Sequence, residues 1–330
     1  MKKSLIALAV LAASGASFAQ SSVTLYGIAD AYLGRTTTTD KPSQVGITNG
    51  GISGSRFGFK GSEDLGGGLT ANFLLEQGFD IDTGTTTAGQ GFSRQSYVGF
   101  SGGFGEVKLG KMWSAYDDIS GAANASFDSV FAPVSNVWLS TGYNANPSNG
   151  VYYASPSMSG FSGAASYAFG ENKGASVDAT NVSAIHVKYE AGPLFVGVGY
   201  QKETTQNGTT TALSTALNSK NFTRLNATYD FGVAKALVGF GRVNAGDQTT
   251  NEWSLGADVP VSAALTVSGG IARSTDNFSG DAVRKGYGLA ASYALSKRTN
   301  VYTGYQSSTK TLAGTDTDVT TLGLGVKHTF

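Results

Sequence analysis

The sequence predicts an all-β protein, a sixteen-stranded antiparallel β-barrel that crosses a membrane. Segments of roughly ten residues, in which apolar residues alternate with polar or small ones, recur along the chain as in barrel strands. The connections between these segments are alternately short and long, as in a series of up-and-down hairpins. The mean hydropathy is only −0.08. A barrel explains this value, because only alternate residues of each strand face lipid.

Sixteen strands are expected, and closed bacterial barrels have an even number of strands. Their expected ranges are 22–34, 52–62, 68–80, 92–101, 106–113, 149–156, 161–169, 182–190, 194–202, 220–231, 233–243, 252–259, 265–274, 285–295, 300–308 and 318–330. Several short connections are rich in glycine, which supplies the positive φ that a tight hairpin requires. No linker or shift in composition divides residues 20–330, so we expect a single barrel domain.

The longest connection, residues 114–148, separates the fifth and sixth expected strands. A loop of this length usually has a role of its own. It contains Phe127, Phe131 and Trp138, and these apolar rings indicate that the loop packs against other parts of the protein.

Residues 1–19 have the features of a cleaved secretion signal. Two lysines follow the first methionine, residues 5–13 are apolar, and residues 17–19 (SFA) place small residues where signal peptidase reads them. Cleavage at that point leaves Gln20 as the first mature residue. The alternative, a membrane anchor, is disfavoured because a spanning helix needs about 20 apolar residues.

The C-terminus is an amphipathic segment that ends in an aromatic residue. Leu322, Leu324, Val326 and Phe330 share one face of the last expected strand. Such an ending is similar to the signal that barrel proteins present to the outer-membrane assembly machinery, so Phe330 is the candidate assembly signal. The alternative is an ordinary edge strand.

Composition and motifs exclude several classes of function. The chain has no cysteine and therefore no thiolate metal site, and its 23 basic and 23 acidic residues provide no excess of positive charge for nucleic acid. The two histidines, His186 and His328, lie on separate strands without ligand spacing, and residues 66–68 (GGG) lack the lysine of a phosphate loop. We expect no catalytic residue, metal or cofactor. A barrel enzyme and a secreted carbohydrate-binding β-sandwich are the remaining alternatives from other classes.

Five segments carry a resemblance to a known family. They are residues 22–27 (SVTLYG), 54–66 (GSRFGFKGSEDLG), 93–100 (SRQSYVGF), 293–299 (YALSKRT) and 328–330 (HTF). Together they resemble the trimeric general porins of the Gram-negative outer membrane, especially those of beta-proteobacteria, and they extend over the whole mature chain.

The resemblance implies a homotrimer in outer-membrane lipid, through which small hydrophilic solutes diffuse passively in a water-filled pore. It also implies that the 114–148 loop folds into the barrel, with basic residues on the wall facing acidic residues on the loop. The candidate acidic residues are Asp117, Asp118 and Asp128. A substrate-selective porin for a sugar or an organic anion is the closest alternative.

Strand alternation identifies candidate basic residues on the pore wall. Arg56 and Lys60 lie opposite Phe57 and Phe59, and a cation facing lipid at mid-membrane costs about 2–4 kcal/mol, so the two cations are expected to face the lumen. By the same argument Arg94, opposite Tyr97, is expected to point inward.

Other wall residues follow from the neighbouring strands. Asn72 and Glu76, opposite Phe73 and Leu75, are expected to line the lumen, and Lys111 is placed near the point where the long loop begins. Such charged rings set the ion preference of a pore. In residues 149–156 this chain departs from the family, because many relatives carry an arginine at the place of Tyr152. The direction of ion selectivity is therefore open.

The first strand has one face of small and apolar residues. This face runs from Val23 to Leu33, and Asp30 lies on the other side. Such a face suits a contact between subunits or a contact with lipid, and the sequence does not decide between them.

Overall fold

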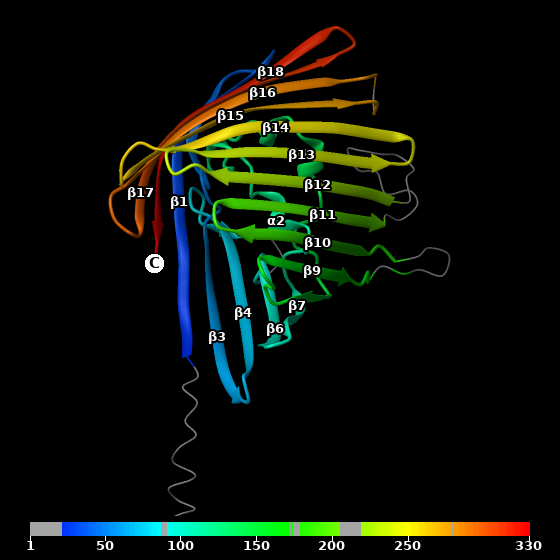
Figure 1. Ribbon diagram of the computed structural model, residues 1–330. Coiled ribbons are helices and arrows are strands. Elements are labelled where there is room, and N and C mark those ends of the chain that lie inside the picture. Colours follow the sequence, from blue (N-terminus) through cyan, green and yellow to red (C-terminus); the bar gives the residue numbers. More distant parts are fainter. Residues whose placement is uncertain (1–21, 87–90, 172, 174–178, 205–218, 279) are drawn as a thin grey trace, which may run out of the picture.

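The computed structural model describes residues 22–86, 91–171, 173, 179–204, 219–278 and 280–330. The expected signal segment, residues 1–19, lies outside the described residues. In the described part, one continuous antiparallel sheet closes on itself through the pairing of β1 with β18 (Figure 1).

Sixteen strands form the barrel wall, which confirms the predicted fold. They are β1 (Ser22–Thr38), β3 (Arg56–Gly66), β4 (Leu69–Asp80), β6 (Gln95–Gly102), β7 (Gly105–Lys111), β8 (Gly150–Ala154), β9 (Phe161–Ala168), β10 (Val182–Ala191), β11 (Leu194–Thr204), β12 (Ser219–Asp230), β13 (Lys235–Ala245), β14 (Gln248–Pro260), β15 (Leu265–Asp276), β16 (Val283–Ala294), β17 (Thr299–Leu312) and β18 (Thr315–Thr329). No described helix is long and apolar enough to cross a membrane.

Two short strands are additional to the expected ones. β2 (Gln44–Asn49) folds back from the first loop and pairs with residues 31–36 of β1, and β5 (Thr85–Thr86) pairs with the end of β4. The first loop is fixed to the wall by Asp30, whose carboxylate accepts the backbone N–H groups of Gly51, Ile52 and Ser53 and the hydroxyl of Tyr302. Asp30 thus lies on the lumen side, as its alternation with apolar residues predicted.

Two connections expected to be long are tight turns. Residues 246–247 alone join β13 to β14, and residues 313–314 alone join β17 to β18, so the prediction of loops over 244–251 and 309–317 was wrong. These segments are rich in Thr, Asn and Asp and resemble hydrated loops in sequence. In the structure they continue the hairpins, as in the pairs Thr309–Asp318 and Thr311–Asp316.

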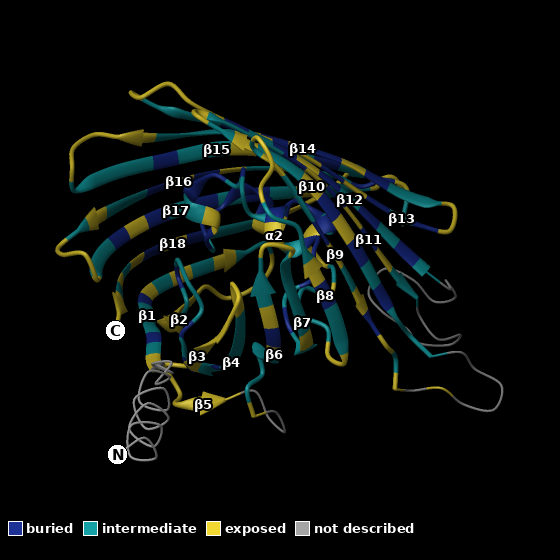
Figure 2. Cartoon of the chain, turned by 60° about the horizontal axis from the view of Figure 1, so that its bottom comes forward, coloured by how far each residue is buried: buried dark blue, intermediate teal, exposed yellow. Residues whose placement is uncertain are grey.

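Burial alternates along the strands (Figure 2). On β12 the inward Phe222, Arg224 and Asn226 are buried, whereas the outward Leu225 and Tyr229 are exposed. An apolar outer face and a polar inner face are typical of a barrel that is surrounded by lipid and filled with water.

The long connection between β7 and β8, residues 112–149, lies inside the barrel and is called the inner loop here (Figure 2). It contains α2 (Asp117–Ser120), η1 (Ser126–Asp128), η2 (Pro133–Asn136) and η3 (Leu139–Thr141). These helices contact β10 to β17, so the inner loop covers that part of the wall and leaves the wall of β3, β4 and β6 facing it across the lumen.

The inner loop is held by apolar contacts and by inward side chains of the wall. Ile119, Phe131 and Trp138 of the loop are almost completely buried. Gly304 and Gly288 of the wall make room for Phe131, because a Cβ atom at either position would collide with it. The expectation that this loop packs on other parts of the protein is confirmed.

Candidate functional site

The wall opposite the inner loop carries a cluster of three charged residues. Arg56 begins β3, Glu76 lies on β4, and Arg94 directly precedes β6. Arg94 Nε lies 2.8 Å from Glu76 Oε1, and Arg56 Nε lies 3.6 Å from Glu76 Oε2. The Tyr26 hydroxyl also donates a hydrogen bond of 2.9 Å to Glu76. Two guanidinium groups therefore share one carboxylate, which leaves the cluster with a net positive charge.

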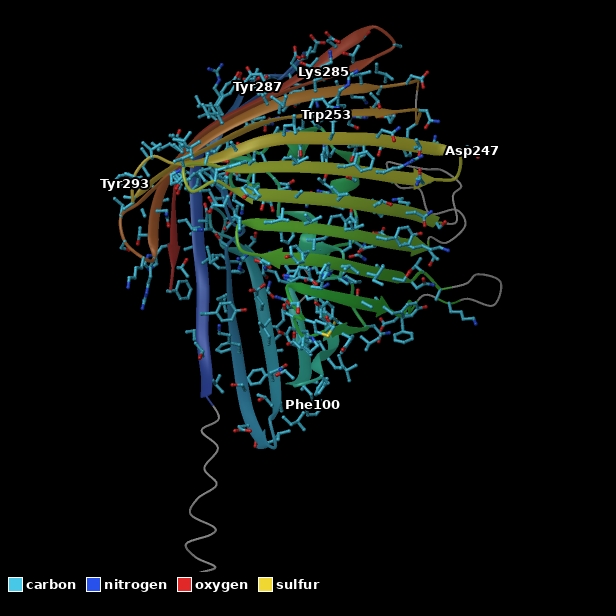
Figure 3. The ribbon with its side chains drawn as sticks, viewed as in Figure 1. Phe100, Asp247, Trp253, Lys285, Tyr287 and Tyr293 are labelled. Carbon is cyan, nitrogen blue, oxygen red and sulfur yellow. The ribbon has the colours of Figure 1, made fainter. Side chains whose placement is uncertain are left out.

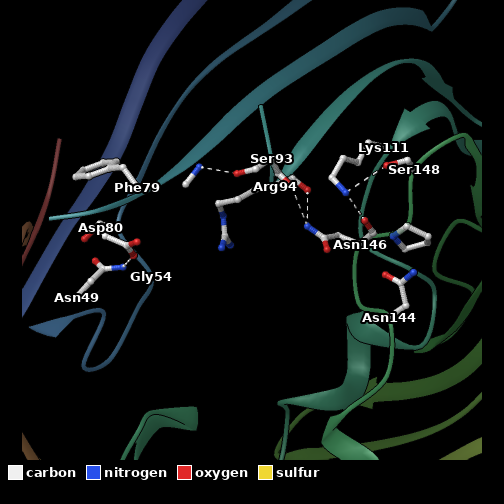
Figure 4. Close-up of a pocket in the computed structure, with 13 residues that line it drawn as sticks. Asn49, Gly54, Phe79, Asp80, Ser93, Arg94, Lys111, Asn144, Asn146 and Ser148 are labelled. Atoms are coloured by element: carbon white, nitrogen blue, oxygen red, sulfur yellow. Dashed lines mark hydrogen bonds between the residues drawn. The ribbon is translucent and has the colours of Figure 1, made fainter. Parts of the chain in front are cut away.

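Arg94 reaches the lumen for a reason other than the one expected from the sequence. Tyr97 also points inward, because the outward positions of β6 are Val98 and Phe100, which are 54% and 46% exposed. Arg94 precedes the strand, and its guanidinium lies 5.0 Å from the centre of the Trp113 ring. Figure 4 shows the Arg94 side chain among the residues that line a hollow of the lumen.

The other expected wall residues lie in three different surroundings. Lys60 lies four residues after Arg56 on the same face of β3, and its Nζ lies 5.2 Å from the centre of the Tyr26 ring. Asn72 donates a weak hydrogen bond of 3.4 Å to Ser101. Lys111 ends β7 and donates a hydrogen bond of 2.7 Å to the Asn146 carbonyl, so it fastens the end of the inner loop.

Asp117 is the acidic residue of the inner loop that interacts electrostatically with the arginine cluster. Its Oδ1 accepts a hydrogen bond of 2.6 Å from the Tyr143 hydroxyl. Burial in the barrel raises the pKa of Asp117 to about 6, and both the Tyr143 hydrogen bond and the charge of Arg94 oppose that rise. Arg94 and Asp117 therefore influence each other across the lumen.

Asp118 and Asp128 lie in separate surroundings. Asp118 Oδ2 accepts a hydrogen bond of 2.6 Å from Tyr152, and Asp128 Oδ1 accepts one of 2.6 Å from Asn124. Burial raises the pKa of both carboxyl groups. The charge that acts on Asp128 comes from Arg224 beneath the loop, so this residue is not brought together with Arg56 or Arg94.

Lys108 is a lumen cation that the sequence analysis missed. Its Nζ lies 4.8 Å from the centre of the Tyr152 ring, 5.2 Å from that of Tyr97, and 2.8 Å from Glu106 Oε2. Lys108 thus places a positive charge beside Tyr152. Its alternation with the outward Val107 and Leu109 is a signal that could have identified it.

The residues that anchor the inner loop were also missed. Glu252 on β14 accepts the N–H groups of Leu139 and Ser140, at 2.6 and 3.2 Å. Arg224 on β12 donates to the Ser120 carbonyl at 2.9 Å, and its guanidinium lies 4.6 Å from the centre of the Trp138 ring. These residues occupy inward positions like those of the arginine cluster, but the inner loop covers them.

A hollow of about 470 Å³ adjoins the arginine cluster (Figure 4). Arg94, Lys111 and Asp80 supply its charged groups, and Asn144 and Asn146 of the inner loop line it as well. Two cations and several amide groups thus surround a water-accessible space between the wall and the end of the inner loop.

Comparisons with known proteins agree with this architecture. Residues 5–313 match the family model of the Gram-negative porins. Outer membrane porin protein 32 of Delftia acidovorans is 37% identical, over 100% of this chain and 94% of the relative. An outer membrane porin protein of Bordetella pertussis is 30% identical over the full length of both chains.

A solved structure, the anion-selective porin from Comamonas acidovorans, superimposes with a TM-score of 0.81 at 27% identity. The match covers 94% of this chain and 100% of that chain. The predicted resemblance is thereby confirmed, and a non-enzymatic function is the one that the family has. The chain belongs to the Gram-negative porin family and forms a water-filled channel of the outer membrane for the passive diffusion of small hydrophilic solutes.

Proposed function

We propose that the narrowest part of this channel lies between the arginine cluster and Asp117 of the inner loop, and that it passes small anions in modest preference to cations. The observation that carries this proposal is the sharing of Glu76 by Arg56 and Arg94. The wall keeps one positive charge that Glu76 does not balance, and Lys60 adds to it further along the lumen, whereas Glu106 balances the charge of Lys108.

The acidic side of the constriction offsets these charges incompletely. Burial raises the pKa of Asp117, Asp118 and Asp128, which makes their negative charges less stable than those of exposed carboxylates. Hydroxyl and amide donors also occupy one oxygen of each group. The similarity to a porin named anion-selective supports the same direction of preference.

Aromatic rings of the wall and of the inner loop keep the cations in place beside the path of the solute. Lys60, Lys108 and Arg94 each lie within 5.2 Å of the centre of a tyrosine or tryptophan ring. A cation on a ring face is attracted by about 0.5–2 kcal/mol, which restrains the side chain without neutralising its charge. Lys60, and the part of the Arg56 and Arg94 charge that Glu76 does not balance, therefore remain available to passing anions.

Zero-current potentials of the reconstituted protein in a planar bilayer, under a gradient of KCl, test this proposal. A sign that corresponds to faster chloride than potassium permeation is expected. The variant R56Q/R94Q is expected to shift the potential toward the cation side. Potassium preference in the unmodified protein would contradict the proposal.

The hollow beside Arg94 supports a second function, selectivity for an organic anion. Arg94 and Lys111 carry two positive charges, which suit the two carboxylates of a small dicarboxylate. Asn144 and Asn146 supply amide groups. Succinate added on one side would then reduce the chloride current in a saturable manner. A current that does not change with succinate would leave only the general diffusion pore.

We also propose that the protein is a homotrimer joined at the barrel seam. Apolar, exposed side chains lie along the outer face of β1, β2 and β18, and they are Val23, Leu25, Leu33, Val45, Ile47, Leu322, Leu324 and Val326. Channel closure in three equal steps at high voltage is the expected signature. A single closing step would indicate a monomer.

Maturation and assembly complete the proposal. Residues 1–19 are the secretion signal, residues 20–330 are the mature barrel domain, and Phe330 is read by the barrel assembly machinery. Support for the last point comes from the seam, where Phe330 exchanges backbone hydrogen bonds of 3.0 and 3.1 Å with Gly27 of β1. Deletion of Phe330 is expected to reduce the amount of folded protein in the outer membrane, and unchanged assembly would contradict this role.

A further inference from the structure

Basic residues gather on the outer face of the barrel, on the strands from β11 to β16. The outward positions of the described residues in these strands include Lys202, Arg242, Arg273 and Lys285, but no aspartate or glutamate. This face lies on the other side of the wall from the lumen cations, and β17 separates it from the apolar seam of β1, β2 and β18. Neither ion conduction nor subunit contact accounts for it.

Arg273 and Lys285 form the centre of this group. They are direct cross-strand partners in the pairing of β15 with β16. Side chains in such a pair have Cβ atoms about 4.5–5.5 Å apart, and like charges placed there repel each other. Within the described part of the chain, neither side chain has a hydrogen bond or an ion pair to relieve that repulsion. No acidic side chain of the described residues therefore balances the two positive charges of this pair.

The position of the pair along the strands places it at the outer surface of the membrane. Arg273 lies three residues before the end of β15, and Lys285 is the third residue of β16. Both ends lie at the rim that also carries the long connections 39–55 and 112–149. The connections at the opposite rim are all short, and the rim of short turns in such barrels is periplasmic. Figure 3 shows Lys285 and Tyr293 toward opposite ends of the barrel. A lipid-facing cation costs about 0–1 kcal/mol at this level instead of about 2–4 at the midplane.

Aromatic residues mark the same level as the membrane interface. Trp253 is the cross-strand partner of Arg273 on β14, and Tyr287 lies two residues from Lys285 on the same face. Both rings are outward, with exposed fractions of 41% and 51% (Figure 3). Tryptophan and tyrosine prefer the headgroup level, where one end of the ring is apolar and the other meets water.

We propose that Arg273 and Lys285 bind a phosphate group of a phosphorylated glycolipid headgroup in the outer leaflet. A guanidinium fork and an ammonium group on neighbouring strands suit a phosphate, which accepts several charge-assisted hydrogen bonds. Trp253 and Tyr287 contact the apolar part of the same lipid. Binding of this lipid removes the repulsion within the pair, so it stabilises this part of the wall.

Lipid binding to the purified protein in detergent tests the proposal, with bisphosphorylated lipid A as the probe and native mass spectrometry as the readout. The variant R273Q/K285Q is expected to bind lipid A about tenfold more weakly or worse, since one charge-assisted contact is typically worth that factor. The matched control K60Q/K108Q loses the same charge from the lumen and is expected to bind lipid A like the unmodified protein.

Three further measurements make the result decisive. Unchanged single-channel conductance of R273Q/K285Q in neutral phospholipid would show that the variant is folded and that the pore function is independent of this site. Dephosphorylated lipid A is expected to bind the unmodified protein and R273Q/K285Q equally weakly. Excess inorganic phosphate is expected to leave lipid A bound. The proposal would be overturned if the unmodified protein and R273Q/K285Q bound lipid A equally well. It would also be overturned if K60Q/K108Q lost as much lipid A binding as R273Q/K285Q, or if inorganic phosphate displaced lipid A completely.

Discussion

Two pairs of arginine and glutamate on the inner face of this barrel have different surroundings. Arg94 and Glu76 lie on the wall that faces the lumen, and the Arg94 side chain is 25% exposed. Arg224 and Glu252 lie on the wall beneath the inner loop, where Arg224 is 1% exposed and Glu252 is completely buried. The strand pattern places Glu76, Arg224 and Glu252 inward, and Arg94, which precedes β6, reaches the lumen as well. The inner loop therefore determines which charges meet passing ions and which ones hold the structure together.

The partners of the two pairs show the same division. Glu76 binds side chains only, namely Arg56, Arg94 and Tyr26, so its surroundings adjust the field in the lumen. Glu252 and Arg224 bind backbone groups of the inner loop, at Leu139, Ser140 and Ser120. Backbone groups that are buried without partners cost free energy, so the covered pair sets the position of the loop.

The largest expected effect follows from removal of the covered glutamate. Glu252→Ala leaves the N–H groups of Leu139 and Ser140 without the carboxylate that accepts them and removes a neighbouring negative charge from Arg224. Loss of one partner from a buried charged network destabilises by about 3–5 kcal/mol. We expect a lower unfolding midpoint in denaturant and larger fluctuations of the single-channel current.

Glu252→Gln is the matched variant, because its amide oxygen still accepts one N–H group. It is expected to give an intermediate unfolding midpoint and a quieter current than Glu252→Ala. A Glu252→Ala protein with the stability and current noise of the unmodified channel would remove the distinction between the two walls.

A smaller effect, on selectivity instead of stability, is expected from the uncovered pair. Arg94→Gln removes a water-facing cation whose interaction with an ion about 4 Å away is worth about 1 kcal/mol in water. The ratio of chloride to potassium permeability should fall by about two- to fivefold, as measured from zero-current potentials, while the unfolding midpoint changes little. Lys285→Gln on the outer face removes the same charge and should leave the ratio unchanged. Equal ratios in Arg94→Gln and the unmodified protein would show that ions do not pass this cluster.

The sequence predicted the barrel better than it predicted the division between the two walls. Alternation is a local property of a strand, so Arg56, Lys60 and Glu76 could be oriented correctly from their neighbours. Arg224 is covered by Trp138 and Ser120, which lie about a hundred residues earlier in the chain. The pattern of residues around Arg224 does not predict a contact with such a distant segment. Arg94 shows a related limit, because alternation does not extend to a residue that precedes its strand.

The charges of the inner loop were the least predictable part of the site. Asp117, Asp118 and Asp128 look equivalent in sequence, but they differ in partner and in the cations that act on them. Tyr143 and Arg94 surround Asp117, whereas Asn124 binds Asp128. The path of the loop across the barrel sets these differences, and that path depends on anchors on distant strands.

The smallest expected effect is a dependence of selectivity on pH. Burial raises the pKa of Asp117 to about 6, so its carboxyl group is mostly charged at pH 7.5 and mostly protonated at pH 5. Acidification removes a negative charge opposite Arg94, and the ratio of chloride to potassium permeability should therefore rise by about twofold or less, with its midpoint near that pKa. Asp117→Asn should have the higher ratio at pH 7.5 already and a flatter profile. Asp128→Asn removes the same charge from a position that Arg94 does not influence, so a pH dependence should remain, with its midpoint moved to lower pH because the charge of Asp128 contributes to the raised pKa of Asp117. A profile flattened equally by both variants would mean that the acidic residues of the inner loop act as one diffuse charge, and the distinction between them would be lost.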